Sequence, residues 1–196
     1  MNGPASGSTG ATRQKLIEAA IELFRQHSVA GTSLQMISDQ LGLTKSAIYH
    51  HFRTRDELLA AIMEPIIDEL TELVQTAEAQ RGIRAQAESM LTGYTALAVA
   101  HRDLFPILSG DPGVADFLRQ RPHWGAIVRR QINLLAQSQP GAGGQLRAVL
   151  VMSGISAAVG VHLDGVDNGE LYEQLVVAGR RTLGLRSSPP AAHSGH

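Results

Sequence analysis

Twelve residues from Thr44 to Arg55 carry the side chains best suited to contact a polyanion. This run contains three full positive charges (Lys45, Arg53 and Arg55), two histidines and a tyrosine, and it has no acidic residue. Cations and hydroxyls bond to phosphate oxygens, and Lys also donates hydrogen bonds to guanine in the major groove of DNA. The run therefore has the composition of a surface that binds nucleic acid.

The element before this run is predicted to be a short helix. Thr32 and Gln35 have the Ser/Thr-x-x-Glu/Gln spacing of a capping box, which starts a helix by satisfying its first backbone N–H groups. Apolar residues then recur at helical spacing at Leu34, Ile37 and Leu41. This pattern predicts a helix with one buried stripe.

The run itself is predicted to form a second helix after a tight turn. Gly42 supplies the turn, where a residue without a Cβ adopts a left-handed backbone at little cost. Thr44 is placed to N-cap the second helix, and Ile48 and Phe52 lie four residues apart on its inner face. Two helices around such a turn form a helix-turn-helix, although an ordinary helical hairpin with a solvated charged face has the same pattern.

A longer pattern favours the helix-turn-helix. The run Thr44-Lys45-Ser46-Ala47-Ile48-Tyr49-His50-His51-Phe52, followed by Arg53-Thr54-Arg55-Asp56-Glu57-Leu58-Leu59, closely resembles the DNA-binding head of TetR-type one-component transcriptional repressors. That family has a small residue, three variable ones, an apolar residue, Tyr, a variable residue, His and Phe, and then a basic residue that opens the next helix. The resemblance covers about residues 12–59, and the rest of the chain matches only in length and helical character.

The resemblance implies an all-α fold of about nine helices. A three-helix DNA-binding head would occupy residues 12–59 and a helical-bundle domain for ligand binding and dimerisation residues 60–185, with disordered segments at 1–11 and 186–196. The expected function is that of a cytoplasmic homodimeric regulator. It would repress transcription from a near-palindromic operator and be released when a small molecule binds.

DNA contacts are expected from the head. Lys45 is the best candidate for a base contact, and by resemblance Tyr49 faces the DNA and Arg55 holds a phosphate. His50 and His51 point about 100° apart on a helix, which makes them a poor metal chelate. The full set of expected DNA-binding residues is Gln35, Thr44, Lys45, Ser46, Tyr49, His50, His51 and Arg55.

Two features of the first and fourth helices depart from regular patterns. The first helix is expected over residues 12–27, and Ser28 stands where the family usually has Gly. If Ser28 is left-handed, it costs about 1 kcal/mol relative to Gly. The fourth helix starts at a second capping box, Thr54 with Glu57, and contains Pro65. Pro65 either takes part in coupling the effector to the head or makes a static bend.

Helices are expected in the body near residues 83–101, 103–108, 114–138 with an interruption at Arg121 and Pro122, 145–163 and 168–184. Loops are expected at 110–113 and 139–144, where Gly and Pro cluster. The last two helices are expected to form a dimer interface, because they contain small residues (Gly154, Ala157, Ala158, Gly160) and an apolar repeat (Leu171, Leu175, Ala178, Leu183). The alternative is that they complete the core of one chain.

An effector pocket is expected between the body helices. Its candidate lining residues are large or polar-tipped: Met90, Tyr94, His101, Phe105, Phe117, Trp124 and His162. Only 4% of the chain is aromatic, which argues against a large flat effector. The shortage of inward Lys and Arg argues against a strongly anionic effector.

Composition limits the other functional classes. The net charge is −1, yet residues 1–59 carry six Lys or Arg against five Asp or Glu, so the local balance permits DNA binding. The chain has no cysteine, no apolar run near the ~18 residues of a membrane span, and no nucleophile or phosphate-loop motif. We expect no catalysis, cofactor or metal, although His101-Arg102-Asp103 and His162-x-Asp164 could be read as acid–base pairs. A helical protein-interaction module is the remaining alternative.

Overall fold

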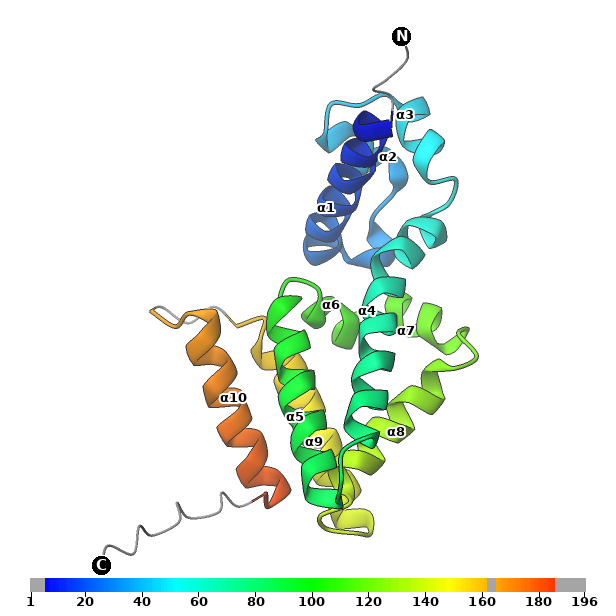
Figure 1. Cartoon of the computed structure of the whole chain (residues 1–196). Helices are drawn as coiled ribbons and strands as arrows, with labels where there is room; N and C mark the ends of the chain where they lie inside the picture. The colour runs from blue at the N-terminus through cyan, green and yellow to red at the C-terminus, as the bar shows by residue number, and fades with distance from the viewer. Residues whose placement is uncertain (1–5, 162–164, 186–196) are drawn as a thin grey trace, which may run out of the picture.

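The computed structural model describes residues 6–161 and 165–185, which form ten helices and no strand. The head contains α1 (Ser6–Gly31), α2 (Leu34–Gln40) and α3 (Lys45–His51), and α4 (Arg55–Glu78) runs from it into the body (Figure 1). The body contains α5 (Ile83–Ala100), α6 (Phe105–Gly110), α7 (Pro112–Arg119), α8 (Trp124–Ala136), α9 (Ala142–Ala158) and α10 (Asn168–Leu183). None of the described helices is long and apolar enough to cross a bilayer.

Several predicted boundaries are wrong. Helix α1 begins at Ser6, so residues 6–11 are helical, whereas residues 1–5 and 186–196 lie outside the described residues. Helix α7 begins at Pro112, because proline is well tolerated in the first turn of a helix. Only Asp111 therefore remains of the loop expected at 110–113. The interruption expected at Arg121 and Pro122 is present, because α7 ends at Arg119 and α8 begins at Trp124. Helix α9 begins at Ala142, inside the expected linker.

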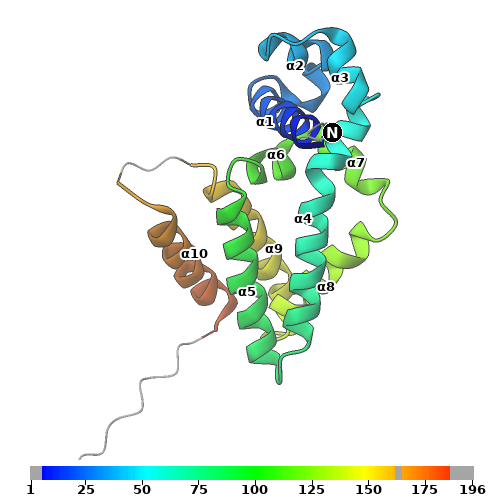
Figure 2. The ribbon, with the colours of Figure 1, turned by 45° about the horizontal axis from the view of Figure 1, so that its top comes forward.

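The inner face of α5 is buried. Its buried residues include Ala87, Met90, Leu91, Tyr94, Leu97 and Ala98. Helix α5 packs against α4, α8, α9 and α10, and Figure 2 shows it in the middle of the body. It is therefore the central helix of the body core.

A second hydrophobic core fills the head, and it extends past the expected boundary at residue 59. It contains Leu16, Phe24, Ile37, Ile48, Phe52 and Leu58 from α1 to α4. It also contains Ile107, Val114, Phe117 and Leu118, which belong to α6 and α7. Helices α6 and α7 therefore contribute to the head core as well as to the body.

Ser28 interrupts α1 with an unusual backbone. Its φ is 67° and its ψ is 165°, and it is the only residue other than Gly with a positive φ among the described residues. This differs from the left-handed helical conformation considered from sequence, and L-residues adopt it at a cost of about 1–3 kcal/mol. Two local hydrogen bonds support the turn: Gly31 N donates to Ser28 Oγ (3.2 Å), and Thr32 Oγ1 donates to the Ser28 carbonyl (2.8 Å).

Ser28→Gly is expected to stabilise the protein. Gly adopts this φ and ψ without strain, and the bond that is lost is exposed and weak, so the net gain should be about 1 kcal/mol. The measurement is the free energy of unfolding in urea. Ser28→Ala is the control, because it keeps the strain and removes only the hydroxyl. If Ser28→Gly is no more stable than Ser28→Ala, the strain at this position is negligible.

Candidate DNA-binding surface and effector cavity

Helix α2 is capped one residue later than predicted. The N-cap is Ser33, whose hydroxyl accepts from Met36 N at 3.2 Å. Thr32 is buried and belongs to the turn after α1, and Gln35 donates to Asp39 Oδ1 at 2.6 Å. Adjacent Thr and Ser residues are both competent caps, so the sequence alone does not separate them.

The turn before α3 is as predicted, and it leaves a hydroxyl pair exposed. Gly42 has a φ of 63°, and Thr44 occupies the N-cap position of α3. The Thr44 side chain makes no capping bond; its hydroxyl lies 3.0 Å from Ser46 Oγ. Both hydroxyls therefore keep donor or acceptor capacity for an outside partner.

Two buried residues fix the orientation of α3. Ile48 is fully buried and Phe52 is nearly so, and the Arg13 guanidinium lies 5.1 Å from the centroid of the Phe52 ring. The opposite side of α3 faces solvent. Tyr49 is 42% exposed, which is unusual for a large aromatic side chain, and Lys45 Nζ lies 5.7 Å from the centroid of its ring.

The predicted DNA-binding residues fall into two groups. Exposed along the start and outer face of α3 are Thr44, Lys45, Ser46, Tyr49 and His50. The other three have partners or are less accessible. His51 is half-buried with its ring edge-on to His50, and Gln35 is held by Asp39. Arg55 Nη1 donates to the Val29 and Ala30 carbonyls, both at 3.1 Å. A phosphate contact by Arg55 stays a prediction, and it would use the remaining guanidinium donors.

The body contains a cavity of about 260 Å³ between α4 and α9. Its apolar wall includes Met63, Ile66, Leu70, Leu97, Phe105 and Trp124, and its polar groups belong to Tyr94, Ser109, Gln131, Ser153 and Ser156. No Asp, Glu, Lys, Arg or His lines it. Small-molecule sites in proteins have this character, a mostly apolar enclosure with a few polar groups.

Three of the seven predicted pocket residues line this cavity: Tyr94, Phe105 and Trp124. Met90 is fully buried in the body core, and Phe117 packs in the head core with the Arg121 guanidinium 4.2 Å from its ring centroid. His101 lies near the surface, 3.1 Å from Glu69 Oε2 on α4. His162 lies outside the described residues. Met90, His101 and Phe117 therefore do not line this cavity, and their place in an effector pocket stays a prediction.

Some polar groups of the cavity are hydrogen-bonded within the protein, whereas the Gln131 amide nitrogen is not. The Tyr94 hydroxyl lies 2.7 Å from Ser156 Oγ, which donates to the Met152 carbonyl at 3.0 Å. Burial raises the pKa of the Tyr94 phenol, although the bond to Ser156 opposes the rise, so the phenol is neutral at physiological pH. Gln131 is 1% exposed, and its Nε2 has no hydrogen-bond partner. Nothing in the sequence marks Gln131 as a site residue, because an isolated Gln on an amphipathic helix is usually solvated.

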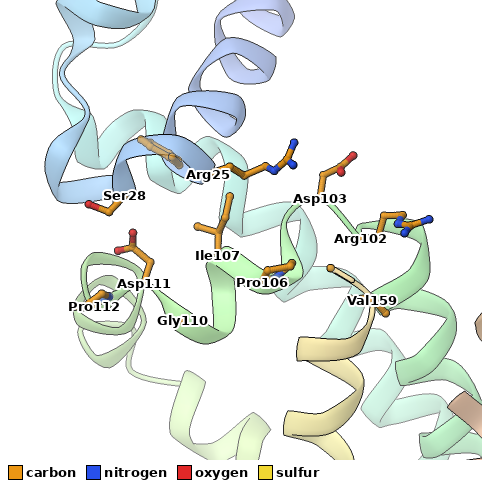
Figure 3. Close-up of a pocket in the computed structure, with 12 residues that line it drawn as sticks. Arg25, Ser28, Arg102, Asp103, Pro106, Ile107, Gly110, Asp111, Pro112 and Val159 are labelled. Carbon is orange, nitrogen blue, oxygen red and sulfur yellow. The ribbon is translucent and has the colours of Figure 1, made fainter. Parts of the chain in front are cut away.

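A cleft of about 440 Å³ separates α1 from α6 and α7, and Asp111 bridges the two sides beneath Ser28 (Figure 3). Asp111 Oδ1 caps α7 by accepting from Gly113 N (2.7 Å) and Val114 N (3.3 Å). Its Oδ2 accepts from Val29 N at 2.7 Å, directly after the strained Ser28. One carboxylate therefore caps a body helix and fixes the end of the first head helix.

A helix-turn-helix head carried by a long helix on a helical body, with a cavity between the body helices, is the architecture of a DNA-binding regulator. Residues 16–62 match the family model described as bacterial regulatory proteins, tetR family. Over these residues the head of this chain is similar to the tetR family.

Similar proteins agree with this assignment. Over 68 residues the chain is 41% identical to the probable acrEF/envCD operon repressor of Escherichia coli (strain K12), covering 34% of this chain and 31% of that protein. It is 27% identical over 103 residues to the HTH-type transcriptional repressor KstR2 of Rhodococcus jostii (strain RHA1), covering 50% of each. The first match spans only about a third of the relative's length.

Most of the chain resembles a solved structure. A member of the TetR transcriptional regulator family from Streptomyces coelicolor A3 superposes with a TM-score of 0.70 at 21% identity, over 88% of this chain and 91% of that one. At this identity the likeness is one of fold. It extends the shared architecture from the head to the body.

Proposed function

We propose that this protein is a sequence-specific DNA-binding repressor, acting as a cytoplasmic homodimer and released from its operator by a small molecule. The observation that carries the proposal is the outer face of α3. Lys45, Ser46 and Tyr49 are exposed there side by side, while Ile48 and Phe52 hold the opposite face in the head core. A rigid helix that presents a cation and hydroxyls suits readout of the major groove.

An apolar stripe on α9 supports dimerisation. Leu146 and Leu150 are 64% and 65% exposed, and Val149 is 43% exposed. Ala157 continues the stripe at helical spacing and is also exposed. Exposed apolar stripes of this kind favour contact with a second chain. On α10, Leu171 and Leu183 are buried in their own core, so α10 would contribute through its outer residues, including Val177 and Ala178.

Leu150→Glu is expected to convert the dimer to monomers. The variant places a charge in the centre of the proposed interface, where burying it without a partner costs several kcal/mol. Sedimentation velocity gives the readout. Ile83→Glu is the matched control, because Ile83 is also an exposed apolar residue (56%) but lies at the start of α5. A Leu150→Glu variant that sediments as the wild type does would place the interface elsewhere.

Three helices that line the cavity also contact the head, which supports control of DNA binding by an effector. Helix α4 supplies Met63, Ile66 and Leu70 to the cavity wall, and its first turn holds α1 through Arg55. Helices α6 and α7 supply Phe105 and Leu118 to the same wall, and they also pack in the head core. A ligand that shifts these helices would change the separation of the two heads and lower operator affinity. Helix α4 continues through the exposed Pro65 without interruption, and a role for Pro65 in this coupling stays a proposal.

The test is fluorescence anisotropy with DNA from upstream of the protein's own gene, titrated at several salt concentrations beside scrambled DNA. We expect tight, sequence-selective binding of two protomers with a steep salt dependence, because neutralised phosphates release counterions. If the upstream DNA is not selected, the operator is sought by selection from random DNA. Equal weak binding to all sequences after that selection would refute the proposal and favour a protein-interaction module.

A further inference from the structure

Among the side chains that line the cavity, Gln131 has a buried polar atom without a hydrogen-bond partner. It projects from α8, and its Nε2 is buried and unbonded. A buried donor without a partner costs about 1–3 kcal/mol. This cost is removed when the Gln131 amide turns toward the cavity and a ligand there supplies an acceptor.

The rest of the wall limits what that ligand can be. No ionisable side chain other than the neutral phenol of Tyr94 lines the cavity, so a charged ligand would lose its hydration without gaining a counter-ion. Ser156 Oγ donates its only proton to the Met152 carbonyl and accepts the Tyr94 hydroxyl proton, so neither hydroxyl has a donor left for a ligand. The volume of about 260 Å³ lies just below the usual range for ligand pockets.

We propose that the effector is a small, neutral, mostly hydrocarbon molecule with an acceptor oxygen, such as a ketone, ester or ether, that receives a hydrogen bond from Gln131 Nε2. This inference rests on the proposed function, in that it takes the cavity as the effector site. The apolar residues of α4 and α8 enclose the hydrocarbon part. Gln131 selects the oxygen, because a ligand that lacks an acceptor leaves the amide unpaired.

The chain contains its own reporter for this test. Trp124 is its single tryptophan, and it lines the cavity. The probes are methyl hexyl ketone and its matched relatives octane, octanoate and octylammonium, with camphor as a compact ketone. Each is titrated into the purified full-length protein without DNA, and the Trp124 emission is followed. We expect a saturable shift with a ketone, and binding at least tenfold weaker for the two ions.

The variant Gln131→Met removes the amide and approximately keeps the volume. We expect it to weaken ketone binding about tenfold and to leave octane binding unchanged or stronger, so the ratio of the two affinities changes about tenfold. Asn133→Met is the matched control, because Asn133 is an exposed amide on the same helix. It should leave both affinities as they are.

Three results would overturn the inference: no saturable shift with either ketone, an ion that binds as tightly as the ketone, or a Gln131→Met variant that leaves the ratio of ketone to octane affinity unchanged. Operator binding is measured separately on the same preparation. Loss of ketone selectivity with intact operator binding contradicts only the effector class. Absence of operator binding with intact ketone selectivity contradicts only the proposed function.

Discussion

Tyr49→Ala is expected to weaken operator binding on the order of a hundredfold or more while leaving the dimer intact. Tyr49 is 42% exposed on the outer face of α3, and Lys45 is the only charged group placed over its ring in the described part of the chain. A good contact in the groove contributes about 1–3 kcal/mol, and a dimer makes it twice. Each 1.4 kcal/mol corresponds to about a tenfold change in affinity.

Three measurements distinguish a lost DNA contact from a lost dimer or a lost fold. Anisotropy on operator and scrambled DNA gives affinity, sedimentation gives the dimer, and circular dichroism gives the fold. Tyr49→Phe is the matched variant: it keeps the ring and removes the hydroxyl, so a partial loss assigns the remainder to contacts of the ring. Normal operator binding by Tyr49→Ala would show that α3 is not the recognition helix.

Asp111→Ala is expected to destabilise the protein by about 2–4 kcal/mol. The change removes the N-cap of α7, which is worth about 1 kcal/mol. It also leaves the N–H of the buried Val29 without its acceptor, which costs about 1–3 kcal/mol more. Urea unfolding followed by circular dichroism measures the loss.

The stability changes of two further variants are compared with that of Asp111→Ala. Asp116→Ala removes a carboxylate from the same helix that pairs only with exposed Arg119, so it should change stability by less than about 0.5 kcal/mol. Asp111→Asn keeps one acceptor oxygen and should lie between the wild type and Asp111→Ala. If Asp111→Ala is as stable as Asp116→Ala, the bridge between α1 and α7 contributes nothing.

The head was predictable because its elements are specified by local patterns. Gly42, Ile48 and Phe52 occupy the predicted places, since turn chemistry and helical spacing act over a few residues. The errors are also local. Ser33 caps α2 in place of Thr32 because both hydroxyls compete for one role. Pro112 starts α7 where a Gly- and Pro-rich stretch suggested a loop.

The cavity was predictable only in part, because it depends on how helices cross. The sequence indicates which face of α5 is buried, but it does not indicate whether a residue there meets a neighbouring helix or an empty space. Met90 and Tyr94 lie one turn apart on that face, and only Tyr94 reaches the cavity. Gln131 is recognisable as a site residue only after its burial and missing partner are known.

The shared core of the head sets a condition for building chimeric regulators. The family model ends at residue 62, which would be a natural junction for attaching this head to a foreign body. Such a graft would leave behind Ile107, Val114, Phe117 and Leu118, and the surfaces of Leu16, Phe24 and their neighbours would face water or an unmatched partner. A transplant that retains DNA specificity therefore has to carry α6 and α7 with the head, or supply a body whose corresponding helices reproduce their shape.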